Sequence, residues 1–468
     1  MGATELLDLD LFAVAERLRR RELSPVELTD ATLAHIARVE PTLHAFVTVM
    51  ADHARAAARV AEAEIAAGRY RGPLHGVPIG VKDLCETAGV RTTVGSSLLS
   101  QWVPERDATV VRKLRDAGAV IVGKLNLHEF AFGATGINPH TGTSRNPWDP
   151  DRVTGGSSSG SGAAVAAGTC FAALGSDTGG SIRMPASFCG IVGVKPTHGR
   201  VSLRGAFPLA PSLDTVGPMA RCVRDAALVL QAIAGHDPDD PWSADVPVGD
   251  YAAHLDAGVA GLRIGIPSAY VFEGFEPEVA AAVERAIATL QSLGARRVEV
   301  EGGSLAIWWI AAMNIVLAEA ADVHRKRYGE QAARFGDDVR GILTAAMELP
   351  GFEYVAAARL RDALRRGEAE EQLFTAADVV LMPATLVVAP RIADVAPGDP
   401  MGSLTHNTAP FNLAGLPALS VPCGVTSAGL PVGLQMVGRQ WDEATLLRVA
   451  AAYEAARGAM PWPRTASA

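Results

Sequence analysis

The sequence lacks an excess of basic residues, a long hydrophobic run and a paired set of cysteines. Its 51 Asp and Glu residues outnumber its 42 Lys and Arg residues, so no basic field attracts a phosphate backbone. The longest apolar runs, 163–174 and 305–318, are shorter than the roughly 20 residues of a membrane-spanning helix. The first residues carry acids where a signal peptide needs Lys or Arg. We therefore expect no nucleic-acid partner and no membrane span.

Cysteine and histidine are also too sparse and scattered for a disulfide framework or a metal centre. The five cysteines are odd in number and form no CxxC pair, which favours a reducing, cytoplasmic location. No HExxH motif, EF-hand or His/Cys cluster is present. We expect neither a metal nor an organic cofactor. These cysteines are Cys85, Cys170, Cys189, Cys222 and Cys423.

Glycine, by contrast, is abundant. The chain has 47 glycines in 468 residues, against a usual share of about 7%, and twelve of them fall between 155 and 205. Apolar residues make up 49% of the chain and charged residues 20%, which excludes a mainly disordered protein. The glycine-rich centre therefore indicates a place where the backbone needs unusual freedom.

Helical and strand-like segments alternate, which predicts an α/β fold with a mixed, twisted central sheet covered by helices on both faces. We expect helices over 9–68, 107–118 and 443–456, and a mainly helical, Ala- and Arg-rich region over 225–370. Buried strands are expected over 75–84, 119–123, 378–386 and 417–425.

Two short motifs suggest chemistry that their context does not support. GAVIVGKL at 118–125 is close to a P-loop, but Leu125 replaces the hydroxyl that holds Mg²⁺, and the segment is typical of an apolar strand. GSSSG at 156–160 fits the nucleophile motif of α/β-hydrolases, but no strand precedes it. We expect neither a nucleotide site nor a Ser-His-Asp triad.

A different set of residues, without histidine, favours nucleophilic catalysis. Lys82 follows a buried-strand pattern, so poor solvation would lower its pKa and make it a base; a surface lysine, or one paired with Asp83, is the alternative. Gly179 and Gly180 allow backbone N–H groups to converge on one point beside Ser181, as in an oxyanion hole. A simple Gly-Gly turn is the alternative there.

Taken together, HGVPIGVKD, TGGSSSGSGAAVAAG, LGSDTGGSIRMPASFCGIVGVKPTHGRVS and SLDTVGPMARCVRDA closely resemble the amidase signature family. NLAGLPALSVPCG and LPVGLQMVG resemble its closing strands, so the resemblance covers about 5–230 and 375–455. It implies four parts: an N-terminal helical segment, the signature core, a variable and mainly helical substrate-selecting region, and the C-terminal part of the core. Their bounds are 1–68, 69–225, 226–375 and 376–468.

The resemblance implies a Ser-cisSer-Lys triad and hydrolysis of an amide, or of an ester or carbamate, through an acyl-enzyme. Ser181 would be the nucleophile, Ser157 the bridging serine after a cis peptide bond, and Lys82 the base. The oxyanion hole would be formed by the backbone N–H groups of Thr178, Gly179, Gly180 and Ser181.

Supporting and substrate-binding residues follow from the same resemblance. Gly155 and Gly156 would permit the serine bridge, and Asp177 and Arg183 would orient the nest of N–H groups through a charged hydrogen bond. Residues of the acyl pocket and of the variable region would bind substrate, which we expect to be a small-molecule amide with an apolar group. These residues are Phe132, Gly133, Trp308, Trp309, Ile310, Met313 and Asn314.

One alternative is the A subunit of tRNA-dependent amidotransferases, which shares these motifs and releases ammonia from glutamine for a partner protein. That branch places an acid shortly before NLAG and an arginine after FG to hold glutamine. Here Thr405 or His406 stands near the acid's place, and Arg340 is slightly out of register. We therefore expect a free-standing amidase, with a homodimer as the family-level expectation.

Overall fold

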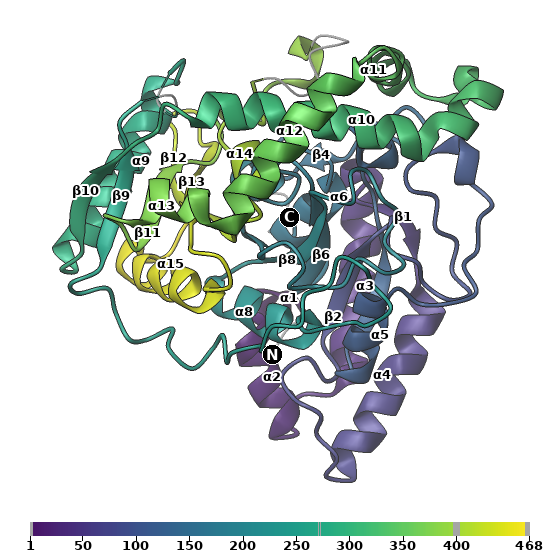
Figure 1. Cartoon of the computed structure of the whole chain (residues 1–468). Helices are drawn as coiled ribbons and strands as arrows, with labels where there is room; N and C mark the ends of the chain where they lie inside the picture. Colours follow the sequence, from purple (N-terminus) through teal and green to yellow (C-terminus); the bar gives the residue numbers. More distant parts are fainter. Residues whose placement is uncertain (1–2, 270, 272, 396–402, 464–468) are drawn as a thin grey trace.

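A computed structural model describes residues 3–269, 271, 273–395 and 403–463 of the chain. One eleven-stranded sheet runs through the molecule in the order β1-β3-β2-β6-β8-β7-β12-β13-β11-β9-β10 (Figure 1). Its strands are β1 (Phe46–Val49), β2 (Pro78–Lys82), β3 (Val120–Leu125), β6 (Ala172–Asp177), β7 (Val192–Lys195), β8 (Thr215–Ala220), β9 (Arg263–Pro267), β10 (Arg296–Val300), β11 (Val379–Pro383), β12 (Ala418–Val425) and β13 (Pro431–Val437). Strands β4 (Arg145–Asn146) and β5 (Asp149–Val153) form a separate ribbon.

The sheet is mixed, as predicted. Strand β2 runs parallel to both β3 and β6, whereas β8 is antiparallel to β6 and β7. Every residue of β2, β3 and β6 is buried, because helices cover both faces of this part of the sheet. The apolar segment that resembled a P-loop is therefore the interior strand β3.

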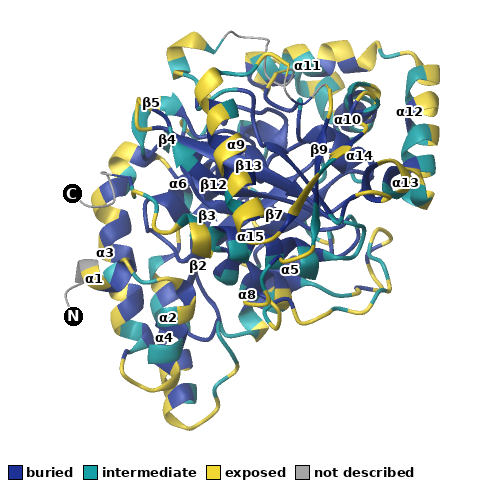
Figure 2. Ribbon diagram, turned by 90° about the vertical axis from the view of Figure 1, so that its left-hand side faces the viewer, coloured by how far each residue is buried: buried dark blue, intermediate teal, exposed yellow. Residues whose placement is uncertain are grey.

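Two core clusters lie on opposite sides of these strands. Helices α5 and α8 contribute to one cluster, and α3, α6 and α7 contribute to the other. Figure 2 shows the buried strands at the centre and exposed residues on the outer faces of the helices. The helices are α1 (Ala3–Leu7), α2 (Leu11–Arg19), α3 (Pro25–Leu43), α4 (Ala51–Ala66), α5 (Thr109–Asp116), α6 (Ser159–Ala166), α7 (Arg183–Cys189), α8 (Val223–Ile233), α9 (Pro277–Ser292), α10 (Leu305–Gln331), α11 (Asp337–Met347), α12 (Gly351–Ala363), α13 (Ala369–Phe374), α14 (Ala409–Leu413) and α15 (Glu443–Arg457).

Local sequence signals account for several boundaries. The Ser24 hydroxyl accepts the Val26 N–H, and Pro25 is the first residue of α3, which are typical features of a helix start. Several strands differ from the prediction, among them β5, which precedes GSSSG where no strand was expected. Strand β1 interrupts the N-terminal helices, and β9 and β10 extend the sheet within the region expected to be mainly helical.

Helix α10 lies with α11 and α12 along one side of the sheet (Figure 1). Within the described residues, 305–334 is the one segment long and apolar enough to meet a length-and-composition test for a membrane span. However, Trp308, Ile315 and Ala320 of this helix are buried in the protein core. Because core helices pass the same test, this single segment is weak support for a membrane span.

Candidate active site

Lys82 ends strand β2 and is completely buried. Its Nζ lies 2.8 Å from Ser157 Oγ, 2.9 Å from Ser158 Oγ and 2.8 Å from Ser176 Oγ. Burial lowers the pKa of Lys82 to about 7. The neighbouring Asp83 does not neutralise it, because that carboxylate pairs with Lys124 at 3.2 Å. Lys82 is therefore neither a surface lysine nor one paired with Asp83.

The three hydroxyl groups come from two segments that the sheet brings to Lys82. Ser157 and Ser158 precede α6, and Ser176 lies on β6, the parallel neighbour of β2. The Ser158 hydroxyl donates to the Ser176 carbonyl oxygen at 3.1 Å, so towards Lys82 it acts as an acceptor. Neither Ser158 nor Ser176 was predicted from the sequence as a partner of Lys82. The alternation of side chains along β6 could have indicated Ser176, had its pairing with β2 been known.

Ser157 follows a cis peptide bond from Gly156, as the resemblance implied. The Gly156 N–H donates to the Ala134 carbonyl at 2.6 Å. A β-carbon at Gly156 would lie 2.6 Å from the Gly136 nitrogen, so no larger residue fits here. The backbone of 133–136 thus packs directly against the peptide that presents Ser157.

The peptide group between Gly179 and Gly180, directly before Ser181, is held by hydrogen bonds at both its N–H and its carbonyl oxygen. The Gly180 N–H donates to Asp177 Oδ1 at 2.8 Å, and Thr408 Oγ1 donates to the Gly179 carbonyl at 2.6 Å. Gly180 has a φ of +135°, and a β-carbon there would lie 2.2 Å from Thr408 Oγ1. This corrects one expectation: the Gly180 N–H is bound to Asp177 and is not available to a substrate oxygen.

Asp177 and Arg183 form the expected ion pair, at 2.9 Å, and both side chains are completely buried. Burial alone would raise the pKa of Asp177, but Arg183, Lys195 and Asn412 together lower it to about 2. Arg183 also donates to the Thr408 carbonyl and to the side chains of Gln435 and Asn412. An ionised carboxylate therefore anchors the Gly179–Ser181 turn to the C-terminal part of the chain.

Ser181 lies two residues before α7 and is 7% exposed. Its carbonyl oxygen accepts the Ser158 N–H at 3.3 Å, so it lies beside the serine loop that contacts Lys82. In the described part of the chain, the N–H groups of Thr178, Gly179 and Ser181 donate to no protein acceptor. Three of the four backbone donors expected at this turn therefore remain for a ligand oxygen.

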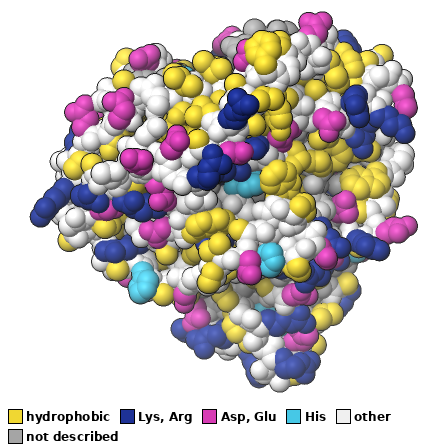
Figure 3. Space-filling model, in the orientation of Figure 1, with side chains coloured by type: hydrophobic (Ala, Val, Ile, Leu, Met, Phe, Trp, Pro, Cys, Tyr) yellow, Lys and Arg dark blue, Asp and Glu magenta, His cyan; other side chains and the backbone are white. Residues whose placement is uncertain are grey.

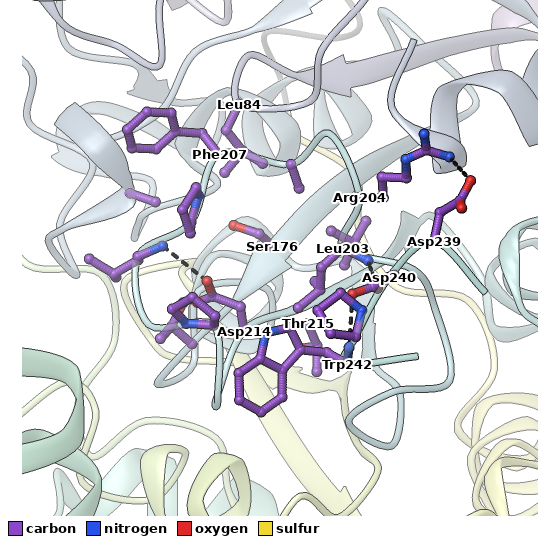
Figure 4. A pocket seen from close by; sticks show the side chains of 18 residues that line it. Leu84, Ser176, Leu203, Arg204, Phe207, Asp214, Thr215, Asp239, Asp240 and Trp242 are labelled. Carbon is purple, nitrogen blue, oxygen red and sulfur yellow. Dashed lines mark hydrogen bonds and ion pairs between the residues drawn. The ribbon is translucent and has the colours of Figure 1, made fainter. Parts of the chain in front are cut away.

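A cavity of about 280 Å³ reaches this region from the side of Ser176 and Thr178 (Figure 4). Asp214 lies in its wall and accepts a hydrogen bond from Thr178 Oγ1 at 2.5 Å; burial raises its pKa. The remaining wall is largely apolar, and the sequence analysis did not predict it. It includes Leu84, Ala131, Leu203, Phe207, Leu209 and Trp242.

The residues expected to bind substrate are not all near this turn. A β-carbon at Gly179 would lie 3.7 Å from Met313 Cε and 3.9 Å from Thr405 Cγ2, and Trp309 Nε1 donates to Thr405 Oγ1 at 3.0 Å. Met313 thus faces the turn directly, and Trp309 contacts it through Thr405.

Other expected substrate residues have different surroundings. Phe132 and Trp308 are buried in the core, Ile310 is exposed, and neither Phe132 nor Gly133 lines the cavity. Asn314 donates to Glu353. Gly133 leaves room for a histidine ring, because a β-carbon there would lie 2.2 Å from His128 Nε2.

Thr405 and Arg340, which were considered for glutamine recognition, have different surroundings. Thr405 faces Gly179, as described above. Arg340 pairs with Asp337 at 2.6 Å and donates to the Phe335 carbonyl at 3.4 Å. Its guanidinium is therefore held on α11 and faces partly to solvent.

Comparisons with known proteins agree with these motifs. The profile of the Amidase family matches residues 27–447. The glutamyl-tRNA(Gln) amidotransferase A subunit of Roseiflexus sp. (strain RS-1) is 46% identical, over 96% of this chain and 97% of that one. The native peptide amidase of Stenotrophomonas maltophilia has a TM-score of 0.84 at 36% identity, covering 97% of this chain and 98% of that one. The crystal structure of the A subunit from Thermotoga maritima gives 0.77 at 34%, covering 97% and 94%.

These relatives correct the expectation about partners. We expected a small-molecule amide substrate and no nucleic acid. That expectation is wrong, because relatives that match over nearly their whole length are subunits of an enzyme named for glutamyl-tRNA(Gln). An acidic surface does not exclude such a role, since a partner protein can supply the basic surface. Figure 3 shows acidic and basic side chains interspersed on one face of the molecule.

Proposed function

Because this chain belongs to the amidase signature family, we propose that it cleaves amide bonds with Ser181 as nucleophile, Ser157 as bridging acid and base, and Lys82 as the ultimate base. The observation that carries this proposal is the completely buried Lys82 amine, surrounded by three hydroxyl oxygens. An amine whose pKa is about 7 is partly neutral at physiological pH and can accept a proton.

The hydrogen-bond partners of Lys82 suit a neutral amine. A neutral amine has two N–H donors and one lone pair. Ser158 and Ser176 can accept the two N–H groups, and the Ser157 hydroxyl can donate to the lone pair. In the proposed reaction Ser157 gives this proton to Lys82 and takes the Ser181 proton as Ser181 Oγ attacks the carbonyl carbon.

The rest of the cycle uses the same groups. The carbonyl oxygen becomes an oxyanion, which the N–H groups of Gly179 and Ser181 stabilise. The C–N bond breaks when Ser157 returns a proton to the leaving nitrogen, which departs as ammonia or an amine. Water then attacks the acyl-Ser181 ester, and its proton follows the same route, so acid is released and Ser181 is restored.

The comparisons favour one setting for this chemistry: the A subunit of a glutamyl-tRNA(Gln) amidotransferase. In that setting the amide is the side chain of glutamine, and the released ammonia is passed to a tRNA-bound acceptor on a partner protein. The support is 44–46% identity over nearly the full length of several such proteins. Five unpaired cysteines suit the cytoplasm, where we place this reaction.

A second candidate, an amidase that acts alone, is favoured by the surroundings of the Gly179–Ser181 turn. Thr405 and His406 stand near the place where the resemblance expects an acid, and the Thr405 hydroxyl is bound to the Trp309 indole. Met313 adds an apolar methyl group beside Gly179. Threonine, methionine and tryptophan provide no charge to hold the ammonium group of glutamine, and they suit an uncharged, apolar acyl group.

The test measures ammonia release from glutamine, from aliphatic amides and from aryl amides. The full chain is assayed alone and with the other subunits of a relative's amidotransferase, with Ser181→Ala as the blank. Ammonia from glutamine, raised by the added subunits, supports the amidotransferase. Turnover of apolar amides alone, with glutamine use gained only by Thr405→Asp, supports the second candidate. Undiminished turnover by Ser181→Ala refutes the proposed nucleophile.

A further inference from the structure

His128 connects the loop that presents Ser157 to a helix of the variable region. Its backbone N–H donates to the Ser157 carbonyl oxygen at 3.1 Å. Its side chain is buried, and its Nε2 lies 2.9 Å from Asp338 Oδ2 on α11. One residue therefore contacts both the expected bridging serine and a helix that supplies none of the expected triad.

The position of the His128 ring is closely defined. The ring lies over the Cα of Gly133, where a β-carbon would come within 2.2 Å of Nε2. Thr135 Oγ1 lies 3.5 Å from Nδ1 on the other side of the ring. Because the backbone of 133–136 also packs against Gly156, displacement of the ring would displace the support of the Gly156–Ser157 peptide.

A second buried contact joins the same two segments. Glu129, the next residue, accepts hydrogen bonds from the Gly336 N–H at 2.7 Å and from Ser96 Oγ at 2.6 Å, and it pairs with His140 at 2.9 Å. Burial raises the pKa of Glu129. Gly336 directly precedes α11, so two consecutive side chains hold the beginning of this helix against the serine loop.

We propose that His128 is a positioning residue for Ser157, and that its contact with Asp338 makes the rate at which Ser181 is acylated depend on the position of α11. This inference rests on the proposed role of Ser157. It goes beyond that role because it makes the acylation rate depend on α11, a helix of the variable region. A ligand or partner that moves α11 would thereby change the acylation rate without contacting Ser181.

Asp338 offers a matched control on the same helix. Asp337 is its neighbour, but its side chain is 90% exposed and pairs only with Arg340 among the described residues. Asp338→Asn removes the charge that faces His128 and keeps the size of the side chain, whereas Asp337→Asn removes an equal charge one residue away. Asp338→Glu restores a carboxylate.

The measurement uses the full chain and p-nitrophenyl acetate, an activated ester. Ser181 Oγ attacks its carbonyl carbon, and p-nitrophenolate leaves and reports acylation. We expect Asp338→Asn to lower the acylation rate at saturating ester about tenfold, since a misplacement of a reacting group by about 1 Å can cost about a hundredfold and a smaller shift is expected here. The KM should stay within about twofold, and Asp338→Glu should recover much of the rate. The midpoint of thermal unfolding should be close to that of Asp337→Asn, which keeps the wild-type rate.

Gly133→Ala tests the same idea by a second route, because its β-carbon would lie 2.2 Å from His128 Nε2 and would displace the ring that contacts Asp338. The double variant should lose less rate than the product of the two single losses, because both substitutions act on the same contact between His128 and Asp338. A folded Asp338→Asn with the wild-type rate, or with a loss confined to KM, overturns the proposal. If Asp338→Asn does not fold, the Gly133→Ala rate decides in the same way. Retention of turnover by Ser181→Ala would instead refute the proposed nucleophile.

Discussion

The Nζ of Lys82 lies 2.8 Å from the Oγ of Ser157, in a completely buried place where its other close partners are also hydroxyl groups. Among the described residues, no carboxylate forms an ion pair with this lysine. A buried ammonium without a counter-ion is costly, so the neutral amine becomes accessible near physiological pH. The pH dependence of the reaction follows from this relationship.

Activity should rise with pH with an apparent midpoint near 7, because burial lowers the pKa of Lys82 to about 7 and the base must be neutral to accept a proton. Below that pH the lysine is protonated and the reaction is slow. The measurement is kcat/KM for p-nitrophenyl acetate from about pH 5 to 9. Lys82→Arg, which stays charged, should remove the activity. A flat profile in the wild-type chain would contradict this assignment.

Ser176→Ala should move this rising limb to lower pH. Ser176 Oγ accepts an N–H from Lys82, and such a bond is stronger to the charged amine. Its loss should lower the pKa of Lys82 further, by about one unit. The control is Ser161→Ala, which removes a buried hydroxyl that is bound to the Leu174 carbonyl and forms no hydrogen bond to Lys82. An unchanged midpoint in Ser176→Ala would show that this hydroxyl does not tune the lysine.

Gly180→Ala should abolish turnover, because its β-carbon would meet Thr408 Oγ1 at 2.2 Å and displace the peptide that orients the Gly179 and Ser181 N–H groups. Gly429→Ala is the control, since Gly429 has a φ of +76° but open space around it. The control should cost only the backbone penalty of about 1–2 kcal/mol and keep its activity. Steady-state rates and urea denaturation separate the two effects.

Asp177→Asn should lower the free energy of unfolding by about 3–5 kcal/mol, because it leaves the buried Arg183 without its counter-ion. The Asp177 pKa is lowered from 3.8 to about 2. Its stabilisation is therefore fully present above about pH 4 and is lost as the pH falls towards 2. Urea denaturation measures both effects. Asp378→Asn, which breaks the partly exposed pair with Arg263, should cost about 1 kcal/mol or less; equal losses in the two variants would contradict the prediction.

The sequence predicted the parts of the site that depend on local pattern. Interior strands such as β2 and β3 are continuous apolar runs, which predicted both strands; for Lys82 at the end of β2 the pattern left a poorly solvated base and a surface lysine as alternatives. Strand β10 was missed because RRVEV is mostly exposed at the edge of the sheet and carries charges. The same limit applies to Gly180: its N–H was expected to face substrate, but its direction depends on the Asp177 side chain, which no local pattern specifies.

Residues distant in the sequence were the hardest to predict. Ser176 reaches Lys82 only because β6 pairs with β2, and Thr408 reaches Gly179 only when α14 packs beside the turn. Gly133 was expected to line an acyl pocket, whereas its lack of a side chain makes room for the His128 ring. Spacing along the chain could not indicate any of these three contacts.

The contacts of Arg183 determine when the enzyme can first act. This guanidinium binds Asp177 beside the turn, and it also binds Asn412 and Gln435, which lie more than 200 residues further along the chain. A nascent chain on the ribosome therefore has Asp177 but lacks these later partners of Arg183 until the segments that carry Asn412 and Gln435 have been synthesised and have docked. Under the proposed function, turnover should therefore begin only after these later segments have docked.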